Sequence, residues 1–150
     1  MEKNLRQLMA FDFGTKHIGI AFGQTITCTA EGIARIDSDD GIPDWGILDK
    51  LVETWKPDAF VVGLPLNMDG SVSHMSRRAK KFSNRIADRY NKKVFMMDER
   101  LSSREVKEQS LNKHSQTKRQ SKPVSKKLDE FDSLAAAVIL QSWFSTQQQG

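Results

Sequence analysis

The sequence predicts a mixed α/β fold, in which one sheet is flanked by helices. Residues 7–36 read as three short strands in close succession, whereas the rest of the chain alternates between helical and strand patterns. Strands in close succession pair as an antiparallel meander, and strands separated by helices pair in parallel. Together the two halves therefore build one mixed sheet.

The predicted meander has strands over residues 7–13, 17–23 and 27–36. In the second of these, HIGIAFG, the large apolar residues Ile18, Ile20 and Phe22 alternate with small ones, which is the period of a strand. Short polar or glycine-containing joints connect the three segments, as in a meander. The first strand is apolar on both faces apart from Asp12, so we expect it near the centre of the sheet.

The second half of the chain supplies the helices and the parallel strands. Apolar residues at helical spacing predict a helix over 44–55, and the continuous apolar run AFVVGL predicts a buried strand over 59–64. The remaining predictions are a helix from about 72 to 90, a strand over 93–97, a helix within 102–111 and a last helix over about 126–145. We expect residues 112–125 to form a mobile loop and residues 145–150 a frayed tail.

Composition bounds the class of protein. A chain of 150 residues with 38% hydrophobic and 28% charged residues suits one soluble domain over residues 1–150. The apolar runs are too short to span a membrane, and the first residues lack the order of a signal peptide. The lone cysteine, Cys28, cannot form an internal disulfide. We therefore expect a cytoplasmic protein that does not contact a membrane.

Acidic residues stand where buried elements are predicted. Asp12 lies inside the apolar first strand, and Asp98 and Glu99 follow the run VFMM. Asp132 precedes the apolar run of the last helix, with Asp129 one turn earlier. An unpaired buried carboxylate is costly, so a salt bridge, hydrogen bonds or a metal ion must compensate it. Three carboxylates from separate elements can hold a pair of Mg²⁺ ions, an arrangement that hydrolyses phosphodiesters.

A purely structural role is the alternative for these acids. Asp98 and Glu99 have Arg100 as a ready ion-pair partner, and Asp132 suits the start of a helix. Asp12 is harder to explain in this way, because its strand is otherwise apolar. The three histidines show no zinc-binding spacing. Taken together, the acids favour a carboxylate metal site.

Four motifs carry a resemblance to a known family. FDFGTKHIGIAFG, VVGLPLNMDGS, DERLSS and FDSLAAAVIL occur in the order typical of the YqgF/RuvX family, small bacterial proteins described as pre-16S rRNA nucleases or Holliday junction resolvases. The family is similar to ribonuclease H-like nucleases and to the RuvC resolvase. The resemblance spans nearly the whole chain. It implies a ribonuclease H-like fold with a five-stranded mixed sheet, and a carboxylate site for Mg²⁺ or Mn²⁺.

The resemblance also assigns roles to individual acids. The family's first-strand acid matches Asp12, the acid of its DER motif matches Glu99, and the acid before its last helix matches Asp132. Alternation along a strand sends Asp98 and Glu99 to opposite faces, so we expect only Glu99 to reach the metals. Asp98 stays a secondary candidate. Asp129 is another, because RuvC-type resolvases often carry two aspartates three residues apart on the last helix.

Basic residues cluster in two stretches. Residues 76–93 contain eight Lys or Arg and one acid, and residues 113–127 contain six and no acid. On the predicted helix, Arg78, Lys81 and Arg85 follow one face. Such clustering suits a nucleic-acid phosphate backbone, and a solvated helix face is the alternative. We expect these three residues to contact nucleic acid.

Four further residues are candidate contacts to nucleic acid. Lys16 matches the basic position of the family's first motif, where it contacts a phosphate or pairs with an acid. Asn67 and Ser71 lie in a loop that leads into a helix, whose N–H groups can bind phosphate. The alternative is a tight turn that serves only conformation. Arg100, beside the acids, completes the set.

The leading hypothesis is a metal-dependent endonuclease with a carboxylate two-metal mechanism. The resemblance implies pre-16S rRNA as the substrate, with the ribosome as a further partner, and branched DNA as the alternative. An ATP-dependent phosphotransferase is a remoter hypothesis, because DFGT also resembles a phosphate loop of the sugar kinase, Hsp70 and actin group. Those proteins need two lobes, and their later glycine motifs are missing. A non-catalytic nucleic-acid-binding protein is the third. We expect a monomer or a weak homodimer.

Overall fold

One sheet organises the molecule. The computed structural model describes residues 5–65, 73–99 and 124–148, the last segment with side chains from 133 to 147. Within these residues six strands have the order β4-β3-β2-β1-β5-β6. They are β1 (Gln7–Asp12), β2 (His17–Gln24), β3 (Thr29–Asp39), β4 (Ile42–Pro43), β5 (Ala59–Leu64) and β6 (Lys93–Asp98). Strands β1 to β4 pair antiparallel, whereas β5 is parallel to both β1 and β6. The predicted mixed α/β sheet is confirmed, with one strand more than expected.

The additional strand is β4, which forms a hairpin with the end of β3. Only two residues of each strand pair. The two residues between them, Asp40 and Gly41, have φ angles of 52° and 91°. Left-handed backbone at both central residues is the conformation of the two-residue hairpin turn that favours Asp-Gly. The stretch DDGIP therefore folds as a hairpin.

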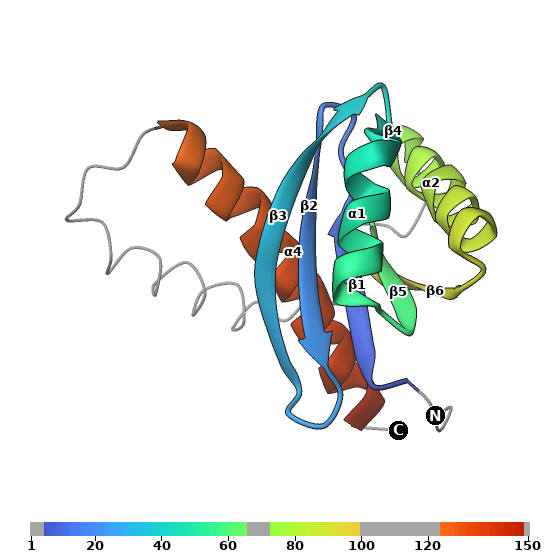
Figure 1. The fold of residues 1–150 in the computed structure, drawn as a ribbon, viewed down its shortest axis with the longest axis vertical. Helices are drawn as coiled ribbons and strands as arrows, with labels where there is room; N and C mark the ends of the chain where they lie inside the picture. Colours follow the sequence, from blue (N-terminus) through green and yellow to red (C-terminus); the bar gives the residue numbers. More distant parts are fainter. Residues whose placement is uncertain (1–4, 66–72, 100–123, 149–150) are drawn as a thin grey trace.

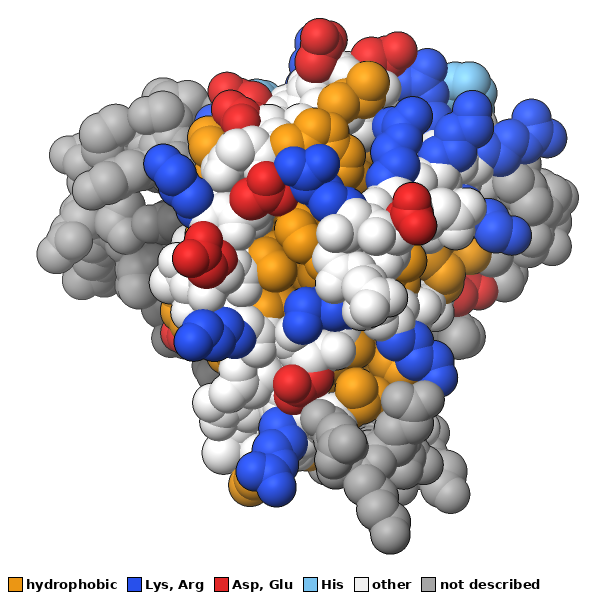
Figure 2. Space-filling view, turned by 45° about the vertical axis from the view of Figure 1, so that its right-hand side comes forward, with side chains coloured by type: hydrophobic (Ala, Val, Ile, Leu, Met, Phe, Trp, Pro, Cys, Tyr) orange, Lys and Arg blue, Asp and Glu red, His pale blue; other side chains and the backbone are white. Residues whose placement is uncertain are grey.

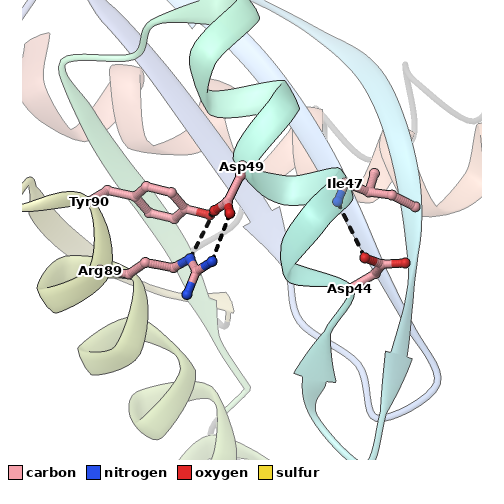
Figure 3. A network of polar contacts seen from close by, with 5 residues as sticks. All are labelled: Asp44, Ile47, Asp49, Arg89 and Tyr90. Carbon is pink, nitrogen blue, oxygen red and sulfur yellow. Dashed lines mark hydrogen bonds and ion pairs between the residues drawn. The ribbon is translucent and has the colours of Figure 1, made fainter.

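Three helices are described: α1 (Trp45–Trp55), α2 (His74–Tyr90) and α4 (Val124–Gln148). α1 begins after Asp44, whose side chain accepts a hydrogen bond from the Ile47 N–H (Figure 3). α2 begins after Ser73, which forms a capping box with Ser76. No helix within the described segments is both long enough and apolar enough to cross a membrane.

The helix boundaries agree closely with the predictions, except at α4. This helix continues to Gln148, beyond the predicted end at residue 145. It also begins at Val124, inside the segment 112–125 that was expected to be a loop. The rest of that segment and the predicted helix within 102–111 lie outside the described residues.

The helices cover both faces of the sheet (Figure 1). α4 packs on one face, against small residues that include Ala10 and Ala21. α1 and α2 cover the other face, where Phe11, Phe60 and Phe82 are fully buried. The Phe11 ring centroid lies 5.6 Å from that of Phe60 and 5.3 Å from that of Phe82. Burial on both faces explains the nearly continuous apolar runs of β1 and β5.

A cluster of polar contacts ties α1 to α2 (Figure 3). Arg89 donates two hydrogen bonds to the Asp49 carboxylate, at 2.8 and 2.7 Å, and the Tyr90 hydroxyl donates a third at 2.6 Å. The Arg89 guanidinium also lies 4.7 Å from the ring centroid of Trp45. The hydrogen bonds from Arg89 and Tyr90 lower the pKa of Asp49 to about 2. Arg89, the last arginine of the basic stretch 76–93, thus joins two helices.

Candidate active site

The carboxyl ends of β1, β5 and β6 meet at one edge of the sheet, because these strands are parallel. We call it the carboxyl edge. Asp12 is the last residue of β1, and Glu99 directly follows the last residue of β6. β5 lies between these strands. The register pairs Phe11 with Val62, so the next residues, Asp12 and Gly63, are neighbours on adjacent strands.

Asp12 faces the side of the sheet that α4 covers. Successive residues of a strand point to opposite faces. Phe11 and Phe13, on either side of Asp12, both belong to the core under α1 and α2. Leu8 and Ala10, which share the parity of Asp12, belong to the core under α4. Asp12, the carboxylate inside the apolar sequence segment, therefore lies at the end of the core under α4.

Glu99 reaches the same face. A Cβ atom built on Gly63 would lie 2.8 Å from Oε1 of Glu99 and 2.7 Å from Cδ1 of Ile139 in α4. The Glu99 carboxylate thus lies directly over Gly63, on the strand next to Asp12. Adjacent strands are about 4.8 Å apart. The absent side chain of Gly63 makes the room that the Glu99 carboxylate occupies.

The neighbouring acid, Asp98, takes the opposite direction. Met97 belongs to the core under α4, and Met96 packs against the core under α1 and α2. Alternation then places Asp98 on the side of Met96. The structure thus brings Glu99, and not Asp98, to the face of Asp12, as the alternation argument predicted. Its role as a metal ligand stays a prediction.

The two aspartates of the last helix are placed by the backbone alone. Asp129 and Asp132 lie in α4 before residue 133, where the described side chains begin. Asp132 precedes Ile139 by seven residues, or about two helical turns, so both positions share one side of α4. Ile139 is the residue that meets Glu99 over Gly63.

The donor set fits a hard divalent cation. Two carboxylates lie on one face over adjacent strands, and carboxylate oxygens are the ligands that Mg²⁺ and Mn²⁺ prefer. Among the described side chains, no group of three His, Cys, Asp or Glu lies together as a metal site. The side chain of the third predicted ligand, Asp132, is not among the described side chains.

Lys16 and the start of α2 lie at the carboxyl edge. Lys16 is exposed in the hairpin that follows Asp12. Ser73, the cap of α2, donates a hydrogen bond to the Pro65 carbonyl oxygen at 2.7 Å, which holds the start of α2 near the end of β5. Figure 2 shows Lys and Arg side chains gathered on the side of the molecule where α2 lies.

The basic residues of α2 do not share one environment. Lys81 and Arg85 are exposed. Arg78 is half-buried and forms an ion pair with Asp40 in the β3–β4 turn. Lys81 and Arg85 are therefore better placed for an outside partner than Arg78. Asn67, Ser71 and Arg100 lie outside the described residues.

The sequence reasoning missed two residues of this region, Gly63 and Arg35. A glycine inside a buried strand often marks a close approach of another group, and this signal was available for Gly63. Arg35 lies in β3, and the register pairs it with Gly19, which pairs in turn with Asp12. Nothing in the sequence alone indicates that Asp12, Gly19 and Arg35 lie in one row across the sheet, because this row depends on the pairing of three strands.

Solved structures share the fold. T. thermophilus RuvC in complex with a Holliday junction substrate matches with a TM-score of 0.57 and 14% identity, over 96% of each chain. The yeast mitochondrial Holliday junction resolvase Ydc2 matches with a TM-score of 0.53 and 10% identity, over 97% of this chain and 80% of that one. The fold is thus the ribonuclease H-like fold of RuvC-type resolvases.

Sequence relatives specify the family. The family model described as "RuvX: Holliday junction resolvase" matches residues 6–146. A protein of Saccharophagus degradans is 48% identical over 137 residues, covering 91% of this chain and 92% of that one. One of Actinobacillus pleuropneumoniae serotype 5b is 44% identical over 142 residues, covering 95% and 98%. Both are named "Putative pre-16S rRNA nuclease". The chain belongs to the RuvX family of resolvase-like nucleases, as its four motifs predicted.

Proposed function

We propose that this protein is a metal-dependent endonuclease that processes pre-16S rRNA in the cytoplasm, with its active site at the carboxyl edge. The observation that carries this proposal is the pair of carboxylates, Asp12 and Glu99, on one face over adjacent strands. Gly63, the neighbour of Asp12 on β5, leaves the space that the Glu99 carboxylate occupies. The name that the two curated relatives share supports the choice of substrate.

The carboxylates act by holding metal. Asp12, Glu99 and Asp132 would hold Mg²⁺ or Mn²⁺, with Asp129 as a secondary candidate. Asp98, the other secondary candidate from the sequence, is set aside because alternation places it on the opposite face of the sheet. Bound metal ions supply an activated water and neutralise charge on the phosphate and the leaving oxygen, the chemistry of two-metal nucleases. Ile139 and the rest of the α4 core close one side of the site and restrict the positions that the Glu99 carboxylate can take.

The basic residues hold the polyanion. Lys16, Lys81 and Arg85 are exposed cations, and the first turns of α2 are held beside the end of β5. Lys and Arg side chains so arranged neutralise backbone phosphates without reading the base sequence. Asn67, Ser71, Arg78 and Arg100 complete the proposed contacts. The ribosome, in the form of its immature small subunit, is the proposed larger partner.

Branched DNA is the second candidate substrate. It is favoured by the likeness in fold to RuvC, which was solved with a Holliday junction, and by the description of the RuvX family as a Holliday junction resolvase. Symmetric cutting of a junction needs two active sites, so this alternative implies a dimer. The rRNA function is compatible with a monomer.

The test is a cleavage assay with Mg²⁺ or Mn²⁺, in which a pre-16S rRNA leader fragment and a four-way DNA junction are each offered. We expect the wild type to cut the RNA, and Asp12→Asn and Glu99→Gln to lose cleavage while remaining folded. Asp12→Asn should melt at the same or a slightly higher temperature, because it removes charge repulsion. Asp98→Asn is the matched control, since Asp98 points to the opposite face and its loss should leave cleavage intact.

Each other outcome has a definite meaning. Symmetric cutting of the junction would select the resolvase alternative. Full activity of Asp12→Asn would refute the assigned site. Binding that persists in Asp12→Asn, with no cleavage by any variant or by the wild type, would identify a non-catalytic nucleic-acid-binding protein.

A further inference from the structure

Three exposed cations follow one another along α2. Arg77, Lys81 and Arg85 are four residues apart, which is the spacing at which side chains of a helix lie one above the other. We call these three residues the α2 row. Another side of the helix carries Phe82 and Ile86, which are fully buried in the core under α1 and α2. The packing of that side keeps the α2 row on the outer surface of the molecule.

The α2 row differs from the other arginines of the helix in its partners. Arg78 is half-buried and pairs with Asp40, and Arg89 pairs with Asp49. Within the part of the chain that the structure describes, no ion pair engages a member of the α2 row. The charges of the row are therefore directed to the outside of the protein.

Helix stability does not explain the α2 row. Like charges four residues apart repel each other, and Arg77 lies in the first turn, where the helix dipole disfavours a cation. α2 has no acid in this turn, and its one acid, Asp88, lies near the other end. A bound polyanion would offset the repulsion, whereas the free helix bears its cost.

The α2 row begins near the carboxyl edge and leads away from it. Ser73, the cap of α2, donates a hydrogen bond at 2.7 Å to the carbonyl oxygen of Pro65, which directly follows β5. From there α2 runs beside β5 and β6 toward their amino ends (Figure 1). Arg77 is thus the member nearest to the edge, and Arg85 is the farthest. Consecutive members are about 6 Å apart along the helix axis, which is close to the step between successive phosphates of one nucleic-acid strand.

We propose that the α2 row binds three successive phosphates of one RNA strand, on one side of the cleavage point. The proposal rests on the proposed nuclease function and deepens it. The carboxyl edge acts on the phosphate that is cut, and the α2 row holds the strand as it leaves this edge. The substrate is then an RNA that is long enough on that side to reach all three cations. Because the contacts go to the backbone, the base sequence of this flank is not read.

The test neutralises the phosphates of the pre-16S leader fragment one at a time, by methylphosphonate linkages, and measures affinity. Ca²⁺ replaces Mg²⁺ so that binding is measured without turnover, and a gel of the recovered RNA verifies that it is uncut. With the wild type, three successive linkages should each cost about tenfold in affinity when neutralised. In Lys81→Gln, the middle linkage of these three should no longer matter. The slope of log K against log salt should also fall by about 0.7, the value of one phosphate of a single strand.

Lys80→Gln is the matched control. It removes the same charge from an exposed lysine at the preceding position of the same helix. Position 80 is rotated by about 100° from position 81, and so lies off the α2 row. This variant should keep the three sensitive linkages and the wild-type salt slope. Equal effects of Lys80→Gln and Lys81→Gln, or sensitive linkages scattered along the fragment, would overturn the proposal.

Arg77→Gln separates binding from a structural role. Its melting temperature should be equal to that of the wild type or slightly higher, because repulsion within α2 falls. Its affinity for the fragment should fall about tenfold, with loss of sensitivity at the linkage nearest to the cleavage point. A lower melting temperature with unchanged affinity would show that Arg77 supports the fold, and would contradict the proposal.

The same experiment distinguishes this proposal from the nuclease function. A wild type that cuts the RNA but shows no run of three sensitive linkages would remove only the α2 row as a binding surface. A wild type that shows this run, but cuts neither the RNA nor the DNA junction, would remove the nuclease function. The α2 row would then stand as a surface that binds one RNA strand.

Discussion

The position of the Glu99 carboxylate depends on a residue without a side chain, Gly63. A methyl group there would lie 2.8 Å from Glu99 Oε1 and 2.7 Å from Ile139 Cδ1, closer than Cβ atoms approach other atoms. Both obstructing atoms are at the ends of flexible side chains, so the fold can yield. We expect Gly63→Ala to cost about 1–3 kcal/mol of stability, as overpacking usually does. Because the Glu99 carboxylate is displaced, cleavage should fall far more than the folded fraction does.

Urea unfolding and single-turnover cleavage of the same preparations measure the two effects. Gly46→Ala in α1 is the control, since the nearest atom to its new methyl group is Asp44 Oδ1 at 3.4 Å. Alanine favours a helix over glycine by up to about 1 kcal/mol, so this variant should be as stable as the wild type or more so. A wild-type cleavage rate in Gly63→Ala would show that the place of Glu99 over β5 is not required.

Single residues also show where sequence reasoning ends. Asp12 could be found because its neighbours in the strand are apolar. Glu99 could be found because it matches an acid of the family's third motif and alternation separates it from Asp98. The face of Arg35 could not be predicted, because the register of β2 and β3 shifts between Ile20 and Ala21. Gly32 before this irregularity and Arg35 after it both face α4, although strict alternation would separate them.

At the scale of elements, α1 and α2 are joined by a contact that depends on pH. The pKa of Asp49 is lowered from 3.8 to about 2, so its ionised form favours the folded state above pH 4. This contribution is lost as the pH falls through 2. Burial and hydrogen bonding to Asp49 raise the pKa of Tyr90 above its usual value of 10. Its neutral hydroxyl therefore favours the folded state up to pH 10, and the contribution is lost at higher pH.

Asp49→Asn should accordingly lower the melting temperature near neutral pH. Toward acid and toward alkaline pH, the melting temperature of this variant should fall less than that of the wild type. Thermal unfolding between pH 2 and pH 11 measures this. Glu53→Gln removes an exposed carboxylate from the same helix and should follow the wild-type curve. If the two variants gave the same curve, the cluster at Asp49 would not link the helices.

Most elements could be predicted because each has an apolar pattern of its own. The strand Ala59–Leu64 has the predicted bounds, since both of its faces are buried and polar residues flank it. The pair Ile42–Pro43 could not be predicted, because two residues carry no periodicity and pair only through the turn at Asp40 and Gly41. The sequence pattern thus predicts long elements, whereas a short strand depends on the strand with which it pairs.

At the scale of the whole molecule, the exposed cations are unevenly placed relative to the site. Lys81 and Arg85 lie on α2, whose first residue is held beside the end of β5. Arg6 and Lys93 are equally exposed, but they lie at the amino ends of β1 and β6. These ends are opposite the carboxyl edge, because the two strands run in the same direction. Lys81 and Arg85 thus share the exposed surface of α2, whereas Arg6 and Lys93 lie apart from it on the strands, with the Lys93 ammonium over the Phe95 ring.

This difference allows directed binding to be separated from attraction by net charge. We expect the double variant Lys81→Ala with Arg85→Ala to weaken binding of the pre-16S leader fragment and to lower its salt slope by about 1.4 to 1.8, the value of two phosphate contacts. Arg6→Ala with Lys93→Ala should leave the slope near that of the wild type, although it removes the same charge. Melting temperatures verify that both variants are folded. Equal losses of affinity and salt slope in the two double variants would mean that RNA binding depends on total charge. No loss in Lys81→Ala with Arg85→Ala would exclude the α2 face as the path of the RNA to the carboxyl edge.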